Sequence, residues 1–114
     1  MTRFTVPGRP VPKERPRFNT RTRHAYTPPR TQAYEAMVGW HARVARVMLT
    51  EKPIILRVWA YTHTKNHGDI DNIAKAVADA LIGIAYVDDK QVQRIEAEWS
   101  LGEDRAEIEI EEAT

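Results

Sequence analysis

The chain has 114 residues, of which 42% are hydrophobic and 29% charged, and it contains no cysteine. This length predicts a single domain, residues 1–114, with its own core. The lack of cysteine excludes a disulfide framework, a thiolate metal site and a cysteine nucleophile. No apolar run approaches the ~20 residues that cross a bilayer, and no secretory signal is evident, so we expect a cytoplasmic protein without membrane contact.

The net charge of +1 conceals two halves of opposite sign. Residues 1–46 hold ten Lys and Arg against two acidic residues, a net charge of +8. Residues 47–114 hold seven basic residues against fourteen acidic ones, a net charge of −7. This asymmetry suggests a basic half that faces a polyanion and an acidic half that holds something else.

Residues 3–7 alternate like a short strand, and residues 8–30 then contain five prolines. Because proline breaks both helices and central strands, the pattern predicts a long basic loop over residues 8–30. A loop of this length in a compact domain is usually functional or disordered. Six of its seven cations are the candidate DNA phosphate contacts: Lys13, Arg15, Arg17, Arg21, Arg23 and Arg30.

Two aromatic residues, Phe18 and Tyr26, lie within this loop. They could stack on bases or wedge between them. The alternative is that both rings anchor the loop against the sheet.

The remaining elements follow from apolar spacing. Thr31 is the expected N-cap of an amphipathic helix over residues 32–49, whose apolar side carries Tyr34, Met37, Val38, His41, Val44, Val47 and Met48. A buried strand, a second helix and two alternating strands joined by a hairpin loop are expected at residues 54–61, 71–82, 92–101 and 106–110. The order β–loop–α–β–α–β–β predicts an α+β fold, a mixed sheet packed by two helices.

Acidic residues in two separate segments form the candidate active site. Asp69 and Asp71 lie where a loop enters the second helix, and residues two apart in an extended stretch point the same way. Lys75 follows Asp71 by one helical turn and shares its face. Asp88 and Asp89 occupy a later turn.

Chain lengths predict that the two segments meet. The second helix descends ~18 Å, and an extended return over residues 83–89 climbs back ~23 Å. We therefore expect the later aspartates to lie beside the earlier ones, with strand 92–101 antiparallel to strand 54–61. If these strands were parallel, the aspartates would lie a sheet's length apart, and the site would have to form across a dimer.

Clustered carboxylates without histidine or cysteine partners favour a hard cation, Mg²⁺ or Mn²⁺. Such an ion activates water for phosphodiester hydrolysis, and a second ion can stabilise the leaving oxygen. Lys75 would neutralise charge in the transition state.

Each feature alone has a simpler interpretation. Asp-x-Asp at a helix start often caps the helix, Asp88 and Asp89 suit a solvated turn, and Lys75 suits an exposed helical face. Their combination favours a site.

The combination resembles the RusA-type Holliday junction resolvases. The similar segments are residues 68–81 (Gly-Asp-Ile-Asp-Asn-Ile-x-Lys-x-x-x-Asp-Ala-Leu) and 86–92 (Tyr-Val-Asp-Asp-Lys-Gln-Val). Residues 6–17 and 26–31 resemble the phage and prophage members of that family. In place of the arginine run that precedes Asp-x-Asp in the best-known members, this chain has Lys65-Asn66-His67-Gly68.

The resemblance implies a homodimeric, Mg²⁺-dependent endonuclease that nicks four-way DNA junctions symmetrically in recombination and repair. By position, its catalytic residues fall on Asp69, Asp71, Asp89 and Lys75, and its metal ligands on the three aspartates with Asp88 as a neighbour. A two-fold junction needs two sites, which also favours a homodimer. The alternatives are a broader nuclease of flaps and forks, and a non-catalytic DNA-binding protein.

Overall fold

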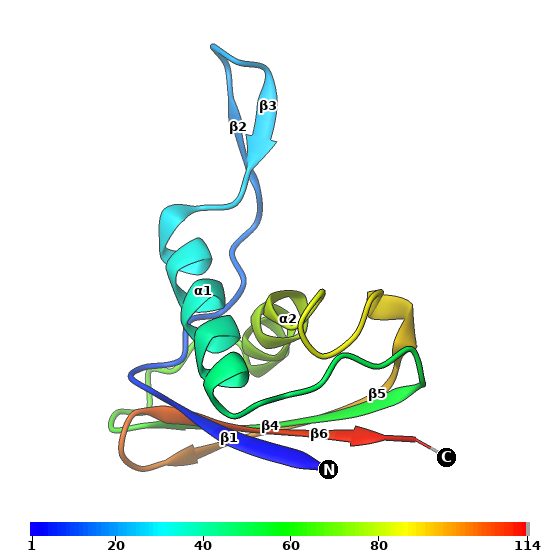
Figure 1. The fold of residues 1–114 in the computed structure, drawn as a ribbon. Coiled ribbons are helices and arrows are strands. Elements are labelled where there is room, and N and C mark those ends of the chain that lie inside the picture. The colour runs from blue at the N-terminus through cyan, green and yellow to red at the C-terminus, as the bar shows by residue number, and fades with distance from the viewer. Residues whose placement is uncertain (114) are drawn as a thin grey trace.

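The computed structural model of the chain describes residues 1–113. Two helices lie on one face of a four-stranded sheet, and a small hairpin stands away from this body (Figure 1). The elements in chain order are β1 (Thr2–Pro7), β2 (Arg17–Asn19), β3 (His24–Tyr26), α1 (Pro29–Val44), β4 (Ile54–Thr62), α2 (Ile70–Ala80), the 3₁₀ turn η1 (Asp89–Gln91), β5 (Val92–Leu101) and β6 (Arg105–Glu112). None of the helices in residues 1–113 is long and apolar enough to span a membrane.

The sheet has the strand order β1-β6-β4-β5. β6 is antiparallel to both β1 and β4, whereas β5 is parallel to β4. The expected α+β class, mixed sheet and two helices are therefore confirmed.

The expected antiparallel pairing of the strands at residues 54–61 and 92–101 is wrong. Residues 83–87 do not return along α2 as an extended run, because they fold into a compact turn. The amide of Gly83, at φ +85°, donates to the carbonyl of Tyr86 at 2.7 Å. The Tyr86 side chain is fully buried and donates its hydroxyl to the carbonyl of Ala78. The chain thus stays at the C-terminal end of α2 and enters β5 beside the start of β4.

The expected hairpin between the last two strands is also wrong. β5 and β6 lie on opposite sides of β4, and both pair with it. The short connection at residues 102–104 passes the end of β4, where the amide of Gly102 donates to the carbonyl of Thr62 at 2.9 Å.

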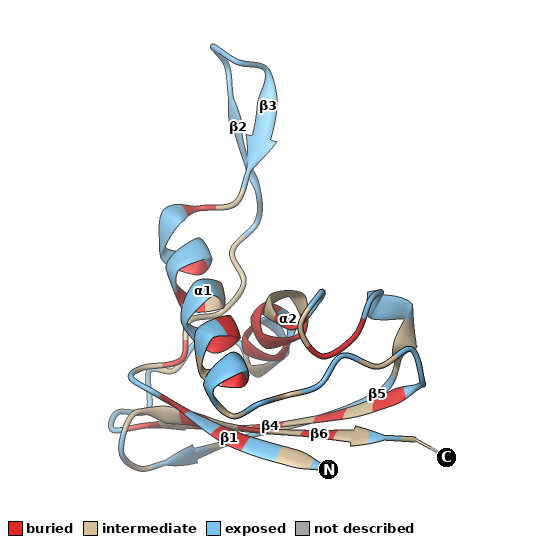
Figure 2. Ribbon diagram, viewed as in Figure 1, coloured by how far each residue is buried: buried red, intermediate tan, exposed pale blue. Residues whose placement is uncertain are grey.

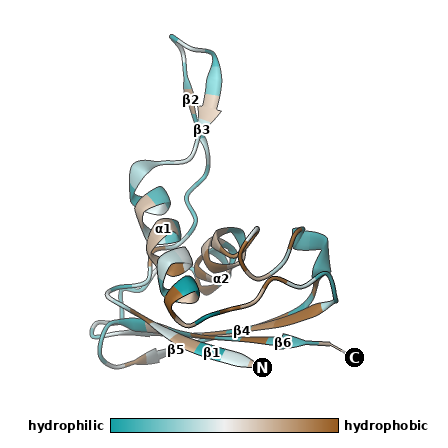
Figure 3. Ribbon diagram, in the orientation of Figure 1, coloured by the Kyte–Doolittle hydropathy of each residue, from teal (hydrophilic) through white to brown (hydrophobic). Residues whose placement is uncertain are grey.

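The core lies between the sheet and the two helices, where the buried residues concentrate (Figure 2). Alternate residues of each inner strand face the helices, as the period of two requires. Hydrophobic residues gather in α2 and in the strands beneath it (Figure 3). Each fully buried aliphatic side chain contributes about 1.5–3 kcal/mol. The fully buried aliphatic residues include Val6, Val38, Ile54, Leu56, Ile73, Val77, Leu81 and Ile108.

Helix α1 differs from its prediction in both bounds and buried face. It begins at Pro29, a residue suited to the first helical position, and its N-cap Pro28 makes no side-chain cap. Thr31 is therefore not the N-cap, and its buried Oγ1 accepts the amide of Glu14 at 3.3 Å. The buried face of α1 consists of Thr31, Tyr34, Val38, Gly39 and Ala42.

Several expected core residues of α1 and the segment after it are instead exposed. Met37 is 39%, Val44 60% and Met48 82% exposed. The cause is close packing at Gly39, where an added Cβ would lie 3.0 Å from the side chain of Ile84. The helix therefore buries the face that carries Gly39 and Ala42 together with Tyr34 and Val38.

Candidate active site

The start of α2 positions the first aspartate pair. Asp69 is the N-cap, and its Oδ1 accepts the amide of Asp71 at 2.9 Å. The capping interpretation is therefore confirmed for Asp69. Asp71 is exposed in the first turn, and only its backbone amide takes part in the cap.

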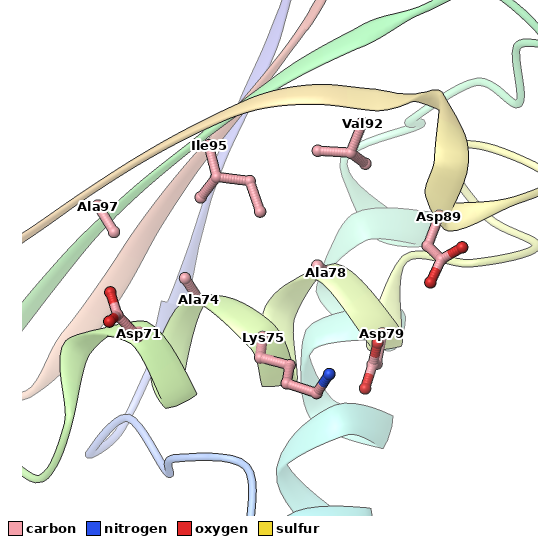
Figure 4. Close-up of a pocket in the computed structure, with 9 residues that line it drawn as sticks. All are labelled: Asp71, Ala74, Lys75, Ala78, Asp79, Asp89, Val92, Ile95 and Ala97. Carbon is pink, nitrogen blue, oxygen red and sulfur yellow. The ribbon is translucent and has the colours of Figure 1, made fainter.

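A pocket of about 530 Å³ lies between α2 and β5. Figure 4 shows Asp71 at one end of it and Asp89 at the other, beside Asp79. Lys75 lies between them, and its ammonium points toward Asp79. The apolar wall consists of Ala74, Ala78, Val92, Ile95 and Ala97.

The second aspartate pair is held by η1. The side chain of Asp88 accepts the amide of Lys90 at 2.9 Å, while the Gln91 side chain accepts the amide of Asp88 at 3.0 Å. This reciprocal pattern is a capping box. The hydrogen bond from the Lys90 amide lowers the pKa of the Asp88 carboxyl group.

The two aspartate pairs do not meet within one chain. The rise along α2 from Asp71 to Asp79 is ~12 Å, and Asp89 lies at the far end. Across residues 1–113, no three His, Asp or Glu side chains are grouped so that they could hold a metal ion. The single-chain gathering expected from the loop lengths is thus wrong, because β4 and β5 are parallel. The catalytic and metal-binding roles of these residues stay predictions.

The basic loop of residues 8–30, called the basic segment below, borders the same start of α2. A second depression, of about 510 Å³, is lined by Arg15, Arg17, Asp69 and Asn72 among others. The amide of Lys13 donates to the carbonyl of Asn72 at 2.8 Å, which fixes the segment against α2. Three of the predicted phosphate contacts, Lys13, Arg15 and Arg17, therefore line the same depression as Asp69.

Lys13 is the least exposed of the six predicted DNA contacts. Its ammonium lies 2.7 Å from Glu35 and 3.2 Å from Asp79, and its side chain is 15% exposed. Burial lowers its pKa, but the hydrogen bonds with Glu35 and Asp79 outweigh that effect and raise it. Lys13 thus connects the basic segment to both helices, a link that sequence reasoning missed.

The five arginines among the predicted DNA contacts are all exposed. Arg17 lies 3.7 Å from Glu14, a weak exposed pair. Within residues 1–113, the others make no ion pair: Arg15, Arg21, Arg23 and Arg30.

Packing of the loop before α2 was also missed by sequence reasoning. The His67 ring stacks on Trp99 of β5 with ring centroids 4.3 Å apart. Trp99 Nε1 donates to Thr62 Oγ1 at 2.8 Å. These contacts fix the loop, and Asp69 after it, near the C-terminal end of β5.

On the face of the sheet that no helix covers, basic and acidic side chains form ion pairs with one another. Arg57 lies 2.7 Å from each of Glu96, Glu109 and Glu111, and these hydrogen bonds raise the pKa of its guanidinium. Arg3 stacks over Trp59 at 4.5 Å in the same layer. A polyanion would find few free cations there, so the helix side of the molecule is the side suited to DNA.

Comparison with known protein families agrees with the resemblance found in the sequence. Residues 7–111 match the family described as Endodeoxyribonuclease RusA, which covers nearly the whole chain. A search of curated proteins gave no match. The match includes both aspartate pairs, Lys75 and the basic segment. The chain therefore belongs to the RusA family of endodeoxyribonucleases, the Holliday junction resolvases.

Proposed function

We propose that the protein is a divalent-metal-dependent nuclease that resolves four-way DNA junctions by two symmetric nicks, acting as a homodimer. The observation that carries this proposal is the pocket between α2 and β5. Asp71, Lys75 and Asp89 line it, and the basic segment lies beside the same helix start.

Carboxylates on two separated segments require a second copy of the chain to complete each site. β5 lies at the edge of the sheet, where it pairs with β4 alone in the described residues. It is ten residues long, and Ile95 is 48% and Leu101 58% exposed. A long unpaired edge with exposed apolar residues is a template for strand pairing.

Antiparallel pairing of β5 with the β5 of a second copy would join the separated groups. Asp89 immediately precedes the start of β5, while the His67–Trp99 stack holds Asp69 near its end. Across a two-fold axis perpendicular to the sheet, the start of one β5 lies beside the end of the other. Each Asp89 would then approach Asp69 and Asp71 of the partner, on the helix side of a continuous sheet.

The donors suit a hard divalent cation. Asp69, Asp71 and Asp89 offer carboxylate oxygens at exposed positions, which is the ligand chemistry of Mg²⁺ and Mn²⁺. When bound, the ion supplies an activated water and charge stabilisation for phosphodiester hydrolysis. Lys75 lines the same pocket, with its ammonium directed toward Asp79, and would neutralise part of the developing phosphate charge.

The test is strand nicking of a mobile four-way junction by wild-type protein and Asp71→Asn, with and without Mg²⁺. Because Asp71 gives the helix cap only its amide, the variant should keep the wild-type melting temperature and junction affinity. We expect a loss of at least about 10³-fold in nicking rate, as for removal of a catalytic charge. Glu51→Gln, an exposed position outside the pocket, is the matched control.

The substrate is tested by a panel of junction, fork, flap and linear duplex at physiological salt. Preferential cutting of the junction supports the proposal. Equal cutting of forks and junctions would show a broader branched-DNA nuclease. Full activity of Asp71→Asn, or of wild type in a chelator, would contradict the metal-dependent mechanism.

A further inference from the structure

The β2–β3 hairpin carries two aromatic rings that are open to solvent. Phe18 is 62% and Tyr26 41% exposed, so the alternative that Phe18 anchors the loop to the sheet is wrong. Cross-strand pairing places Phe18 opposite Ala25, and Tyr26 opposite Arg17 on the other face of the hairpin. An alanine methyl is too small to cover a phenyl ring. The hairpin stands away from the core, and all its residues are exposed (Figure 2).

The tip of the hairpin has a defined structure. The side chain of Asn19 accepts the amides of Arg21 and Thr22 at 2.9 and 3.3 Å, and its carbonyl accepts the amide of Arg23 at 2.8 Å. Arg23 has φ +57°, a conformation that glycine or asparagine adopts at lower cost. The turn therefore has an arginine at a position where glycine or asparagine would adopt the backbone conformation at lower cost.

The base of the hairpin is tied to the body. Glu14 donates its amide to Thr31 of α1, and Lys13 bridges Glu35 and Asp79. Pro16 and Pro28 flank the two strands and restrict the backbone there. A projection with a fixed base and a fixed tip loses little conformational entropy when it binds.

The charge of the hairpin selects its partner. No acidic residue occurs between positions 15 and 34, and Arg17, Arg21 and Arg23 lie in the hairpin itself. At the centre of a four-way junction the phosphates of four arms converge, and base stacking is interrupted. In continuous duplex each base is covered on both faces, so an aromatic side chain finds an open base face only where the stack is broken.

We propose that the β2–β3 hairpin enters the branch point and that Phe18 stacks on an unstacked base there, which makes Phe18 a determinant of selectivity for branched DNA. The inference rests on the proposed function and adds the structural element that recognises the branch. The arginines neutralise the converging phosphates, while the phenyl ring distinguishes a branch from a continuous duplex.

The experiment measures binding without divalent metal, so that no DNA is cut. Wild type, Phe18→Ala, Phe18→Trp and the control Thr22→Ala are titrated against a four-way junction and a linear duplex of equal length. 2-Aminopurine is placed either at the branch point or within an arm. Thr22 is a suitable control because it lies at the same tip and contributes only its backbone amide to the turn.

We expect Phe18→Ala to weaken junction binding by about tenfold or more, the loss of one aromatic–base stack. Its duplex affinity should stay within about twofold of wild type, since the charge is unchanged. The branch-point fluorescence change should vanish in Phe18→Ala and persist in Phe18→Trp and Thr22→Ala. Thermal melting of all variants should match wild type, because Phe18 is outside the core.

Different failures have different signatures. If wild type prefers the junction but Phe18→Ala gives the same affinities and fluorescence, the proposed function stands and the role of Phe18 is overturned. An equal loss on junction and duplex also overturns it, as does a changed oligomeric state with unchanged DNA binding. If wild type does not prefer the junction over duplex, the proposed function itself fails, and this inference fails with it.

Discussion

Lys13 illustrates how a single residue changes role between sequence and structure. Its position in a basic segment predicts a phosphate contact. Its ammonium is instead shared by Glu35 and Asp79, and it holds the basic segment against both helices. Asp79 belongs to the motif of residues 68–81, so the sequence identified it as a residue of interest. Nothing in the sequence indicated that it would pair with Lys13, which lies 66 positions earlier.

Replacing Lys13 by methionine tests this positioning role. The variant leaves Glu35 and Asp79 facing each other, so we expect a loss of about 1–2 kcal/mol in the free energy of unfolding. The measurement is a urea melt at pH 7, with Lys65→Met, at an exposed position outside these ion pairs, as the control. An unchanged urea midpoint, together with a shallower salt dependence of DNA binding, would instead make Lys13 a direct phosphate contact.

At the scale of elements, the strands and helices follow from apolar spacing, but their connections do not. A run of β-branched and aromatic residues predicted β4, and alternating apolar residues predicted β5 and β6, each within one or two residues of its observed bounds. The helical pattern predicted α2. The direction of β5 depended on whether residues 83–87 are extended. Burial of Tyr86 against α2 made them a turn, and this is a tertiary contact that local pattern does not encode.

The hairpin was also beyond sequence reasoning, because its strands have three residues each and five prolines surround them. The candidate aspartates and Lys75 were identifiable from the motif alone. The distance between the two aspartate pairs could not be predicted from the motif, since it depends on the direction of β5.

The basic hairpin should bind DNA through charge that does not depend on sequence. Each arginine that contacts a phosphate contributes a slope of about −0.9 in log affinity against log salt. We therefore expect Arg21→Ala and Arg23→Ala each to make the slope shallower by about 0.9, on duplex and junction alike. Filter binding over a salt series measures it, with Arg43→Ala in the last turn of α1 as the control. An unaltered slope in both variants would remove the hairpin from the DNA interface.

On the scale of the whole molecule, the two faces of the sheet and its β5 edge differ in charge and in what covers them. The uncovered sheet face is neutralised by its own ion pairs, the helix side carries the pocket and the basic segment, and the β5 edge is open. One chain holds the two aspartate pairs at opposite ends of α2. A two-fold dimer through β5 would convert this separation into two complete sites that face one DNA junction.

The most direct test mixes two inactive variants. Asp71→Asn and Asp89→Asn carry different affinity tags, and mixed dimers are purified after co-expression. If each site combines Asp71 of one copy with Asp89 of the other, a mixed dimer has one site with both substitutions and one intact site. It should then nick junctions at about half the wild-type rate, one strand at a time. Mixed dimers that are as inactive as either variant alone, beside active wild-type dimers carrying the same two tags, would contradict the shared site.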